Sequence, residues 1–391
     1  MTSEWHEVPL RELVGYISKG IAPSYAEVAS ETTIRVLNQK CNRNFQISYG
    51  DSRLHDTLKK KVPPERYVKP DDILINSTGA GTAGRIAQIE DVPSATTIDG
   101  HMTLIRSNGK VTQKFLGYAL KAHQWEVLQL DEGSTGQTEL NRDRLLDEIM
   151  INYPVSFDEQ NAIVGTLESI DRKLIVNEQL NDNLADLLQT IYQERFGNDI
   201  LAVNQGVLSD ICSYSRDKVA VSELNVITYF STENMLSGKA GSTEATSLPT
   251  TSQTTACHKG DTLISNIRPY FKKIVYCEDK CGCSTDVLCF TPSQPCYSAY
   301  LFSTLYADKF FAFMVAGSKG TKMPRGDKQQ IMTYPVVLPS EEELAGFNTI
   351  ASPLLEQIYS NRAENKRLSI LRDTLLPKLM SGEINVSAVQ L

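Results

Sequence analysis

The sequence lacks any run of about 20 apolar residues, which is the length that a membrane-spanning helix requires. Its first seven residues, Met1 to Glu7, are polar and acidic and contain no apolar core of a secretory signal. With 41% hydrophobic and 22% charged residues, the composition is that of a globular protein. We expect a cytoplasmic protein with no membrane partner, and its 391 residues predict two or three domains.

The motifs of several enzyme classes are also missing. The Gly-rich stretch Gly79–Arg85 lacks the Lys-Ser/Thr end of a nucleotide-binding loop, and no zinc-protease or serine-hydrolase motif occurs. Asn152-Tyr153-Pro154 has the letters of an amino-methyltransferase motif in the wrong order, and the five histidines are scattered along the chain. We therefore expect no catalytic residues and no cofactor in this chain.

Cysteine spacing argues against a metal centre. Seven of the eight cysteines follow residue 200, and the tightest group is Cys277, Cys281 and Cys283. The sequence of a zinc site typically contains paired C-x2-C spacing or accompanying histidines, and neither is present. The sequence predicts no metal, and reduced thiols packed in a core of the second half.

Charge is unevenly distributed although the net charge is −8. Residues 31–70 hold nine Lys/Arg against four Asp/Glu, whereas residues 156–200 hold three against nine. A bound polyanion responds to the electrostatic potential of the surface that it contacts, not to the net charge of the chain. A basic segment beside an acidic helix is therefore compatible with a DNA-binding protein. Solvated surface charge explains both segments equally well. If the basic segment binds DNA, we expect its contacts to include Arg35, Lys40 and Arg43.

The chain repeats itself with a period of about 184 residues. Gly133–Gly136 recurs as Gly317–Gly320, and the strand-like run Lys69–Asn76 recurs as Lys259–Asn266. Each half then ends in a long helix that begins at Ser156 or Ser340 with acidic residues in its first turn. The common order of these matches predicts an internal duplication.

Apolar residues in both helices recur in steps of three and four, the period of a coiled-coil seam. The expected seam positions are Ile163, Leu167, Ile170, Leu174, Leu184, Leu188 and Ile191 in the first helix, and Phe347, Ile350, Leu354, Ile358, Leu368, Leu371 and Leu375 in the second. Each seam also carries two asparagines, which we expect to fix register: Asn177 and Asn181, and Asn361 and Asn365. Pro353 is expected to kink or break the second helix.

Between the helices, short β-rich runs alternate with turns rich in Gly, Ser, Thr and Asn. The predicted class is α+β, with two similar domains and two long helices. The expected divisions are residues 1–155 for the first domain, 156–198 for the central helix, 199–338 for the second domain, and 339–391 for the last helix and tail.

Two loops in each half suit contacts with a polyanion. In the first loop of the first half, small residues leave backbone N–H groups accessible to a phosphate, and the second loops offer side chains that read base edges. The candidate DNA contacts of the first half are Asn76, Thr78, Gly79, Thr82, Arg85, Ser134, Thr135, Gln137, Thr138, Asn141 and Arg142. Those of the second half are Asn266, Arg268, Tyr270, Lys272, Lys273, Ser318, Lys319, Thr321, Lys322 and Arg325.

The chain resembles the specificity (S) subunit of type I restriction–modification systems. The resemblance is carried by the C-terminal run Leu375–Ile384, by the starts of the two halves, Trp5–Leu10 and Gly206–Ile211, and by Gly-Ser-x-Gly loops followed by Tyr-Pro and an acidic helix start. It extends over essentially the whole chain. It implies two target-recognition domains separated by a long antiparallel two-helix coiled coil, with a pseudo-twofold internal repeat.

The resemblance further implies a non-catalytic subunit that reads a bipartite asymmetric site on double-stranded DNA. The implied partners are two adenine-N6 methyltransferase (M) subunits and restriction/translocase (R) subunits. S-adenosylmethionine, ATP and Mg²⁺ belong to those partners. Three alternatives stay open: a stand-alone DNA-binding regulator, a coiled-coil scaffold that links two protein-binding modules, and a variant that serves a single fused methyltransferase–nuclease polypeptide.

Overall fold

The computed structural model describes residues 4–79, 81–132, 139–197 and 204–389. By its contacts the chain forms two compact units: unit 1 comprises residues 1–174 and 366–391, and unit 2 comprises residues 175–365. The divisions fall inside the two long helices, α4 (Phe157–Phe196) and α9 (Glu341–Met380), so each helix belongs to both units. The domain limits expected from the sequence stay a prediction.

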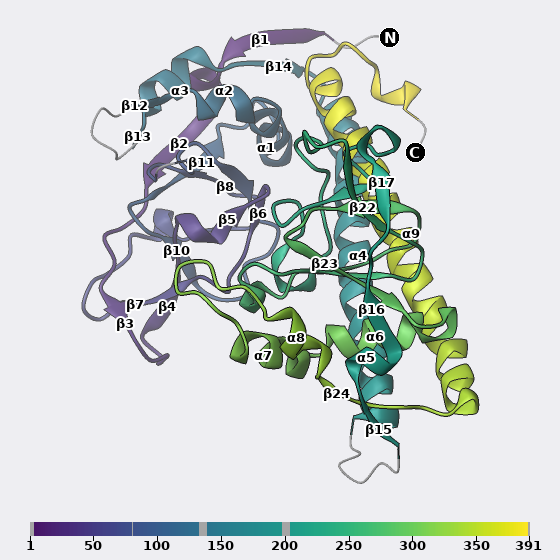
Figure 1. Cartoon of the computed structure of the whole chain (residues 1–391). Coiled ribbons are helices and arrows are strands. Elements are labelled where there is room, and N and C mark those ends of the chain that lie inside the picture. The colour runs from purple at the N-terminus through teal and green to yellow at the C-terminus, as the bar shows by residue number, and fades with distance from the viewer. Residues whose placement is uncertain (1–3, 80, 133–138, 198–203, 390–391) are drawn as a thin grey trace. The chain divides into compact units, whose positions relative to one another are not determined.

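Unit 1 is built on two four-stranded sheets (Figure 1). The first, entirely antiparallel, has the order β2 (Val14–Lys19), β11 (Met102–Ser107), β8 (Ile73–Asn76), β9 (Ile86–Gln88). The second has the order β10 (Thr96–Ile98), β4 (Thr33–Leu37), β7 (Arg53–Asp56), β3 (Tyr25–Ala26). Two-stranded pairs are β1 (Trp5–Pro9) with β14 (Met150–Pro154), β5 (Asn42–Arg43) with β6 (Gln46–Ile47), and β12 (Asp131–Glu132) with β13 (Glu139–Leu140). The helices are α1 (Gln113–Ala122), α2 (Gln124–Leu128) and α3 (Arg142–Glu148).

Unit 2 repeats this plan. Its antiparallel sheet has the order β16 (Cys212–Tyr214), β23 (Val287–Pro292), β20 (Thr262–Ser265), β21 (Ile274–Tyr276), and β15 (Gln205–Val207) pairs with β24 (Pro335–Val337). The second sheet has the order β17 (Lys218–Ala220), β19 (Gln253–Cys257), β22 (Cys281–Cys283), β18 (Tyr229–Phe230). The helices are α5 (Leu208–Ile211), α6 (Ser298–Tyr306), α7 (Asp308–Ala316) and α8 (Lys328–Met332). The predicted α+β class and internal repeat are confirmed.

All four residues of strand β8, and all four of strand β20, are buried. Because successive side chains of a strand point to opposite sides, both faces of each strand are therefore buried. In unit 1, Ile73 and Ile75 enter the core that α1 covers, and Leu74 enters a second core. In unit 2, Ile264 and Leu263 divide in the same way. Both faces of each central strand are therefore apolar, which explains why these runs read as continuous hydrophobic stretches.

The repeat is offset by one residue from the alignment that the sequence suggests around these strands. The Asp72 carbonyl accepts a hydrogen bond from the Ile89 N–H, and the Asp261 carbonyl accepts one from the Cys277 N–H. Asp72 is therefore equivalent to Asp261, and the predicted match of Asn76 with Asn266 is wrong. A shift of one residue places a strand's side chains on the opposite face, so only the matched hydrogen bonds reveal the correct alignment.

The two long helices run antiparallel in unit 2, where asparagines pair across them. Asn177 donates to Asn365 at 2.8 Å, and Asn361 donates to Asn181 at 2.9 Å. Asn177 also donates to Glu364. Asn177, Asn181 and Asn361 are buried, so each amide is removed from water and needs its partner.

Two details of the second helix differ from the prediction. Helix α9 continues through Pro353, so the predicted break is wrong; the proline can only withhold a hydrogen bond from the Thr349 carbonyl. Phe347 and Ile358 are buried as predicted, but Ala351 and Leu355 are also buried, and Ile350 is exposed. This part of α9 packs into the globular core of unit 2, so its buried face follows that core as well as α4. No helix in the described part of the chain meets the length and hydropathy of a membrane span.

The Asn181–Asn361 pair generates a stability prediction. Asn181→Leu or Asn361→Leu alone should cost about 1–3 kcal/mol, because each leaves the other amide buried without its partner. The double Leu variant should recover most of that loss, since two apolar groups can replace a buried polar pair. Urea unfolding of the three variants measures the coupling; strictly additive losses would contradict it.

Candidate nucleic-acid interface

The structure brings together the two loops that the sequence singles out in each half. In unit 1, Thr78 after β8 bridges to Glu139 of β13, and the Leu140 N–H donates to the Ser77 carbonyl at 2.8 Å. In unit 2, Ile267 after β20 bridges to Arg325, and the Gly326 N–H donates to the Asn266 carbonyl at 3.3 Å. Each unit therefore places the described residues of both loops at the end of its central strand.

Different side chains occupy equivalent positions on this common frame. Glu139 in unit 1 corresponds to Arg325 in unit 2, and Thr78 corresponds to Ile267. Glu139 forms an ion pair with Lys19, whereas Arg325 pairs with Asp286 at 3.0 Å. One scaffold thus carries two different sets of polar groups.

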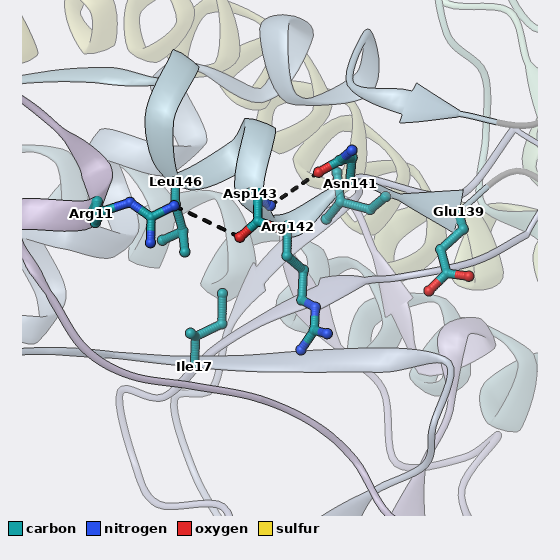
Figure 2. Close-up of a pocket in the computed structure, with 8 residues that line it drawn as sticks. Arg11, Ile17, Glu139, Asn141, Arg142, Asp143 and Leu146 are labelled. Atoms are coloured by element: carbon teal, nitrogen blue, oxygen red, sulfur yellow. Dashed lines mark hydrogen bonds and ion pairs between the residues drawn. The ribbon is translucent and has the colours of Figure 1, made fainter.

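In unit 1, Asn141 and Arg142 line a hollow of about 640 Å³ beside Arg11 and Ile17. Arg11 forms an ion pair with Asp147 at 2.5 Å, which raises the pKa of Arg11 and lowers that of Asp147. Figure 2 shows the Arg142 side chain between Ile17 and Glu139, with no dashed line to its guanidinium. Among the described residues Arg142 has no ion-pair partner, so this exposed cation is available to a ligand.

Asn141 is a helix N-cap, a role that its sequence pattern did not predict. Its side chain accepts hydrogen bonds from the Asp143 and Arg144 N–H groups at 3.0 and 3.1 Å and so caps helix α3. In unit 2, Asp327 caps α8 in the same way through Gln329 and Gln330. The repeat places a helix cap directly after the second loop in both units.

The predicted phosphate-binding loop uses its N–H groups internally. The N–H groups of Thr82 and Ala83 donate to the Gly79 carbonyl, that of Gly84 donates to Asn76, and that of Arg85 donates to Thr82. Positive φ angles at Gly79, Gly81 and Gly84 produce this tight fold. The expectation that these amides face a phosphate is therefore wrong for the four named donors.

A second hollow, of about 570 Å³, brings Arg43 and Arg85 together with Asn42 and Gln124. Arg43 is exposed, and Arg85 donates to the Gly81 carbonyl at 3.1 Å. Gln124 orders this region by donating to Gly84 and accepting from the Ile86 N–H. Gln124 and Asn42 lie far from Arg85 in sequence, and no local motif marks them.

Several other candidate DNA contacts of unit 1 already form hydrogen bonds within the protein. Asn76 is fully buried and hydrogen-bonded to Asn42 and Gln39, so it does not face a ligand. Thr78 bonds to His101 at 2.7 Å, Thr82 donates to Gly79, and Arg35 donates to Ser52. Lys40 is exposed. Ser134, Thr135, Gln137 and Thr138 lie outside the described residues.

In unit 2, the lysines of the loop that follows β20 already have partners within the protein. Lys272 lies 3.0 Å from Asp308, and Lys273 donates to the Thr232 carbonyl at 2.6 Å; burial lowers the pKa of Lys273. Arg268 has a left-handed backbone and is half-buried, and Asn266 is buried. Tyr270 is half-exposed and contacts Phe271.

The Gly-Ser loop of unit 2 keeps more of its groups at the surface. Lys319 pairs with Asp327 at 2.5 Å, which lowers the pKa of Asp327, and Ser318 donates to the Val315 carbonyl. Thr321 and Lys322 are exposed, and Lys322 makes no ion pair within the ranges that the structure describes. Lys322 is thus an available cation of unit 2, although its position differs from that of Arg142, whose equivalent by the helix caps is Lys328.

Comparison with known proteins finds a family that the first half of the chain resembles. Residues 2–185 match the family model of the type I restriction modification DNA specificity domain. The first 185 residues of the chain are therefore similar to this family. The resemblance that the C-terminal run and the repeated loops indicate is therefore confirmed, and the second unit repeats the fold of the matched one.

Two relatives of the type I specificity family match short segments. The specificity subunit of the type I restriction enzyme MjaIX from Methanocaldococcus jannaschii is 34% identical over 73 residues, which cover 19% of this chain and 17% of the relative. That of HindI from Haemophilus influenzae is 43% identical over 49 residues, or 12% and 11%. The matched segments span less than a fifth of either relative.

A solved structure extends the likeness to the whole fold. The type I restriction–modification S subunit from M. genitalium is 17% identical, with a TM-score of 0.63 over 97% of this chain and 96% of that one. At this identity the match shows a shared fold, in agreement with the two long helices and the repeated units described above.

The cap assignment predicts a difference between two variants of one residue. Asn141→Ala should destabilise unit 1 by about 1 kcal/mol, because α3 loses its N-cap. Asn141→Asp should leave stability nearly unchanged, since Asp327 fills the equivalent position in unit 2. Thermal unfolding of both variants measures this; equal destabilisation would refute the capping role.

Proposed function

We propose that this chain is a sequence-specific DNA-recognition subunit whose two units each read one part of a split site on double-stranded DNA. The observation that carries the proposal is the convergence of the same two loops in both units, with different polar side chains at equivalent positions. A repeated frame with varied contact residues suits a protein that reads two different short sequences. The match to a DNA specificity domain supports it.

In this proposal Arg142 and Lys322 are the first contacts of their units. A guanidinium presents donors in a planar fork that fits the two acceptors of guanine or a phosphate. A lysine ammonium acts as a point charge and suits a phosphate. Arg43 and Arg85 add cationic groups at the second hollow of unit 1.

The chain performs no chemistry of its own and carries no cofactor. It directs two adenine-N6 methyltransferase subunits, and restriction/translocase subunits where they are present, to the site; S-adenosylmethionine, ATP and Mg²⁺ act in those partners. The relatives from M. jannaschii and H. influenzae are specificity subunits of type I restriction enzymes, which supports partners of this kind. The acidic first turns of α4 and α9 are compatible with docking surfaces for such subunits.

The proposal is tested by mapping N6-methyladenine across a host genome after co-expression with the neighbouring methyltransferase. We expect one split motif with a fixed gap. If an intact complex methylates no motif, the scaffold alternative replaces this proposal. If the chain alone binds a specific duplex, it is a stand-alone regulator.

Two matched variants assign the half-sites. Arg142→Ala should relax recognition in one half of the motif only, by about 1–3 kcal/mol for a lost base contact. Lys322→Ala should act only on the other half, or weaken binding equally for all sequences if it contacts phosphate. Duplex competition at two salt concentrations measures both; Arg142→Ala relaxing both halves would contradict the division between units.

A further inference from the structure

Five cysteines gather in one small core of unit 2. Nine buried apolar residues form it, and five of them are Cys257, Cys277, Cys281, Cys283 and Cys289. They come from both four-stranded sheets of the unit, because Cys257 and Cys281 lie on β19 and β22 whereas Cys289 lies on β23 and Cys277 follows β21. The predicted packing of thiols in a core of the second half is confirmed.

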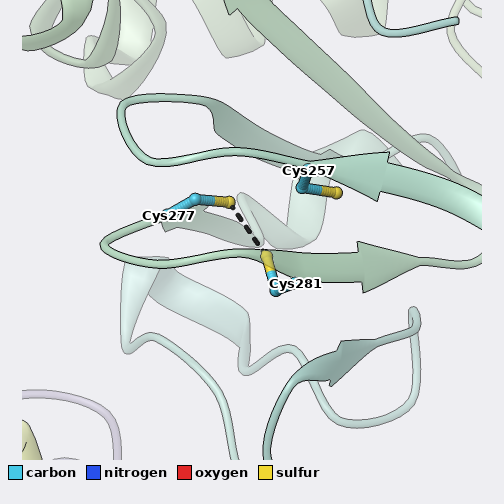
Figure 3. A group of neighbouring side chains, drawn as sticks. All are labelled: Cys257, Cys277 and Cys281. Carbon is cyan, nitrogen blue, oxygen red and sulfur yellow. Dashed lines mark hydrogen bonds between the residues drawn. The ribbon is translucent and has the colours of Figure 1, made fainter. Parts of the chain in front are cut away.

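Three of these thiols converge on one point. Cys257 lies directly opposite Cys281 in the antiparallel pair of β19 and β22, and Cys277 approaches from the neighbouring turn. The three Sγ atoms all lie within 4.8 Å of one another, and those of Cys277 and Cys281 are 3.4 Å apart (Figure 3). Zinc–thiolate bonds of about 2.3 Å place the sulfurs of a tetrahedral site about 3.8 Å apart. Small shifts would therefore bring all three sulfurs within bonding distance of one ion.

The internal repeat shows what the same positions hold when only packing is required. Cys277 is equivalent to Ile89, since both donate their N–H to the carbonyl of the matching aspartate. Cys289 lies opposite Leu263 as Leu104 lies opposite Leu74. The equivalent core of unit 1 is aliphatic apart from Met102 and one thiol, Cys41. Aliphatic side chains fill this architecture, so the concentration of thiols in unit 2 needs another cause.

We propose that Cys257, Cys277 and Cys281 bind a structural zinc ion, with Cys289 as the fourth ligand. The Cys289 thiol lies within hydrogen-bonding reach of Cys257 and 3.2 Å from the buried Asp261 carboxylate. Binding displaces the thiol protons, so that four thiolate–zinc bonds replace four S–H bonds. The ion joins the two sheets of unit 2, whereas the equivalent core of unit 1 is mainly aliphatic. Paired C-x2-C spacing is absent because the ligands come from separate strands, which is why the sequence predicts no metal.

The test is the metal content of the full chain, purified with reductant and without chelator from zinc-replete cells, alone or with its methyltransferase. Elemental analysis should give about one zinc per chain. Cys277→Ile, which installs the residue of unit 1, should reduce the content at least about tenfold. Cys212→Val, which removes a buried thiol of unit 2 outside the cluster, should leave it unchanged.

A second measurement covers the case in which Cys277→Ile fails to fold. Wild-type chain stripped of metal is titrated with Co²⁺, and thiolate-to-cobalt charge-transfer bands with tetrahedral d–d bands are expected, reversed by added zinc. Wild-type chain that contains no zinc and gives no such bands would overturn the proposal. A Cys277–Cys281 disulfide in the freshly isolated, metal-free protein would overturn it equally.

Discussion

The antiparallel pairing of α4 and α9 is the constraint on which the rest of the structure depends. Each helix contributes to both units: Leu167 and Leu379 are buried in the core of unit 1, whereas Leu188 and Phe347 are buried in that of unit 2. Neither unit has a complete core without a segment from each helix. Across the middle of this pair the asparagine amides bond to each other, so a slip of either helix would leave buried amides without partners.

On this shared support, each unit buries its central strand, and the loop that comes after this strand differs between the units. Strands β8 and β20 are buried on both faces, which fixes the direction in which the next loop leaves the sheet. A second loop meets the first, and a capped short helix, α3 or α8, anchors the end of that second loop. The polar groups at this junction differ between units, whereas the hydrogen bonds that support them are the same. In the proposed function, the contact side chains of one unit can therefore change without disturbing its fold.

Local and periodic signals in the sequence predict the class, the duplication and the extent of both helices. They fail where the deciding partner is distant in sequence. Ile350 fits the heptad pattern but is exposed, because the core of unit 2 rather than α4 alone selects the buried face. Asn76 has a side chain suited to DNA and is instead buried against Asn42. The Gly79–Arg85 loop has the composition of a phosphate site, yet the N–H groups of Thr82, Ala83 and Arg85 donate to carbonyls of the same loop. The sequence does not predict the thiol cluster, because its cysteines lie on separate strands and in the turn between them.

The central proposal, that the two units read the two parts of one split site, implies that the paired helices set the distance between those parts. It is tested most directly by inserting one heptad into both α4 and α9 at the paired asparagines, which preserves the phase of the seam and adds about 10 Å. Methylation mapping should then show both half-sites unchanged, with a gap longer by about three base pairs. An intact, active complex with an unchanged gap would contradict the account.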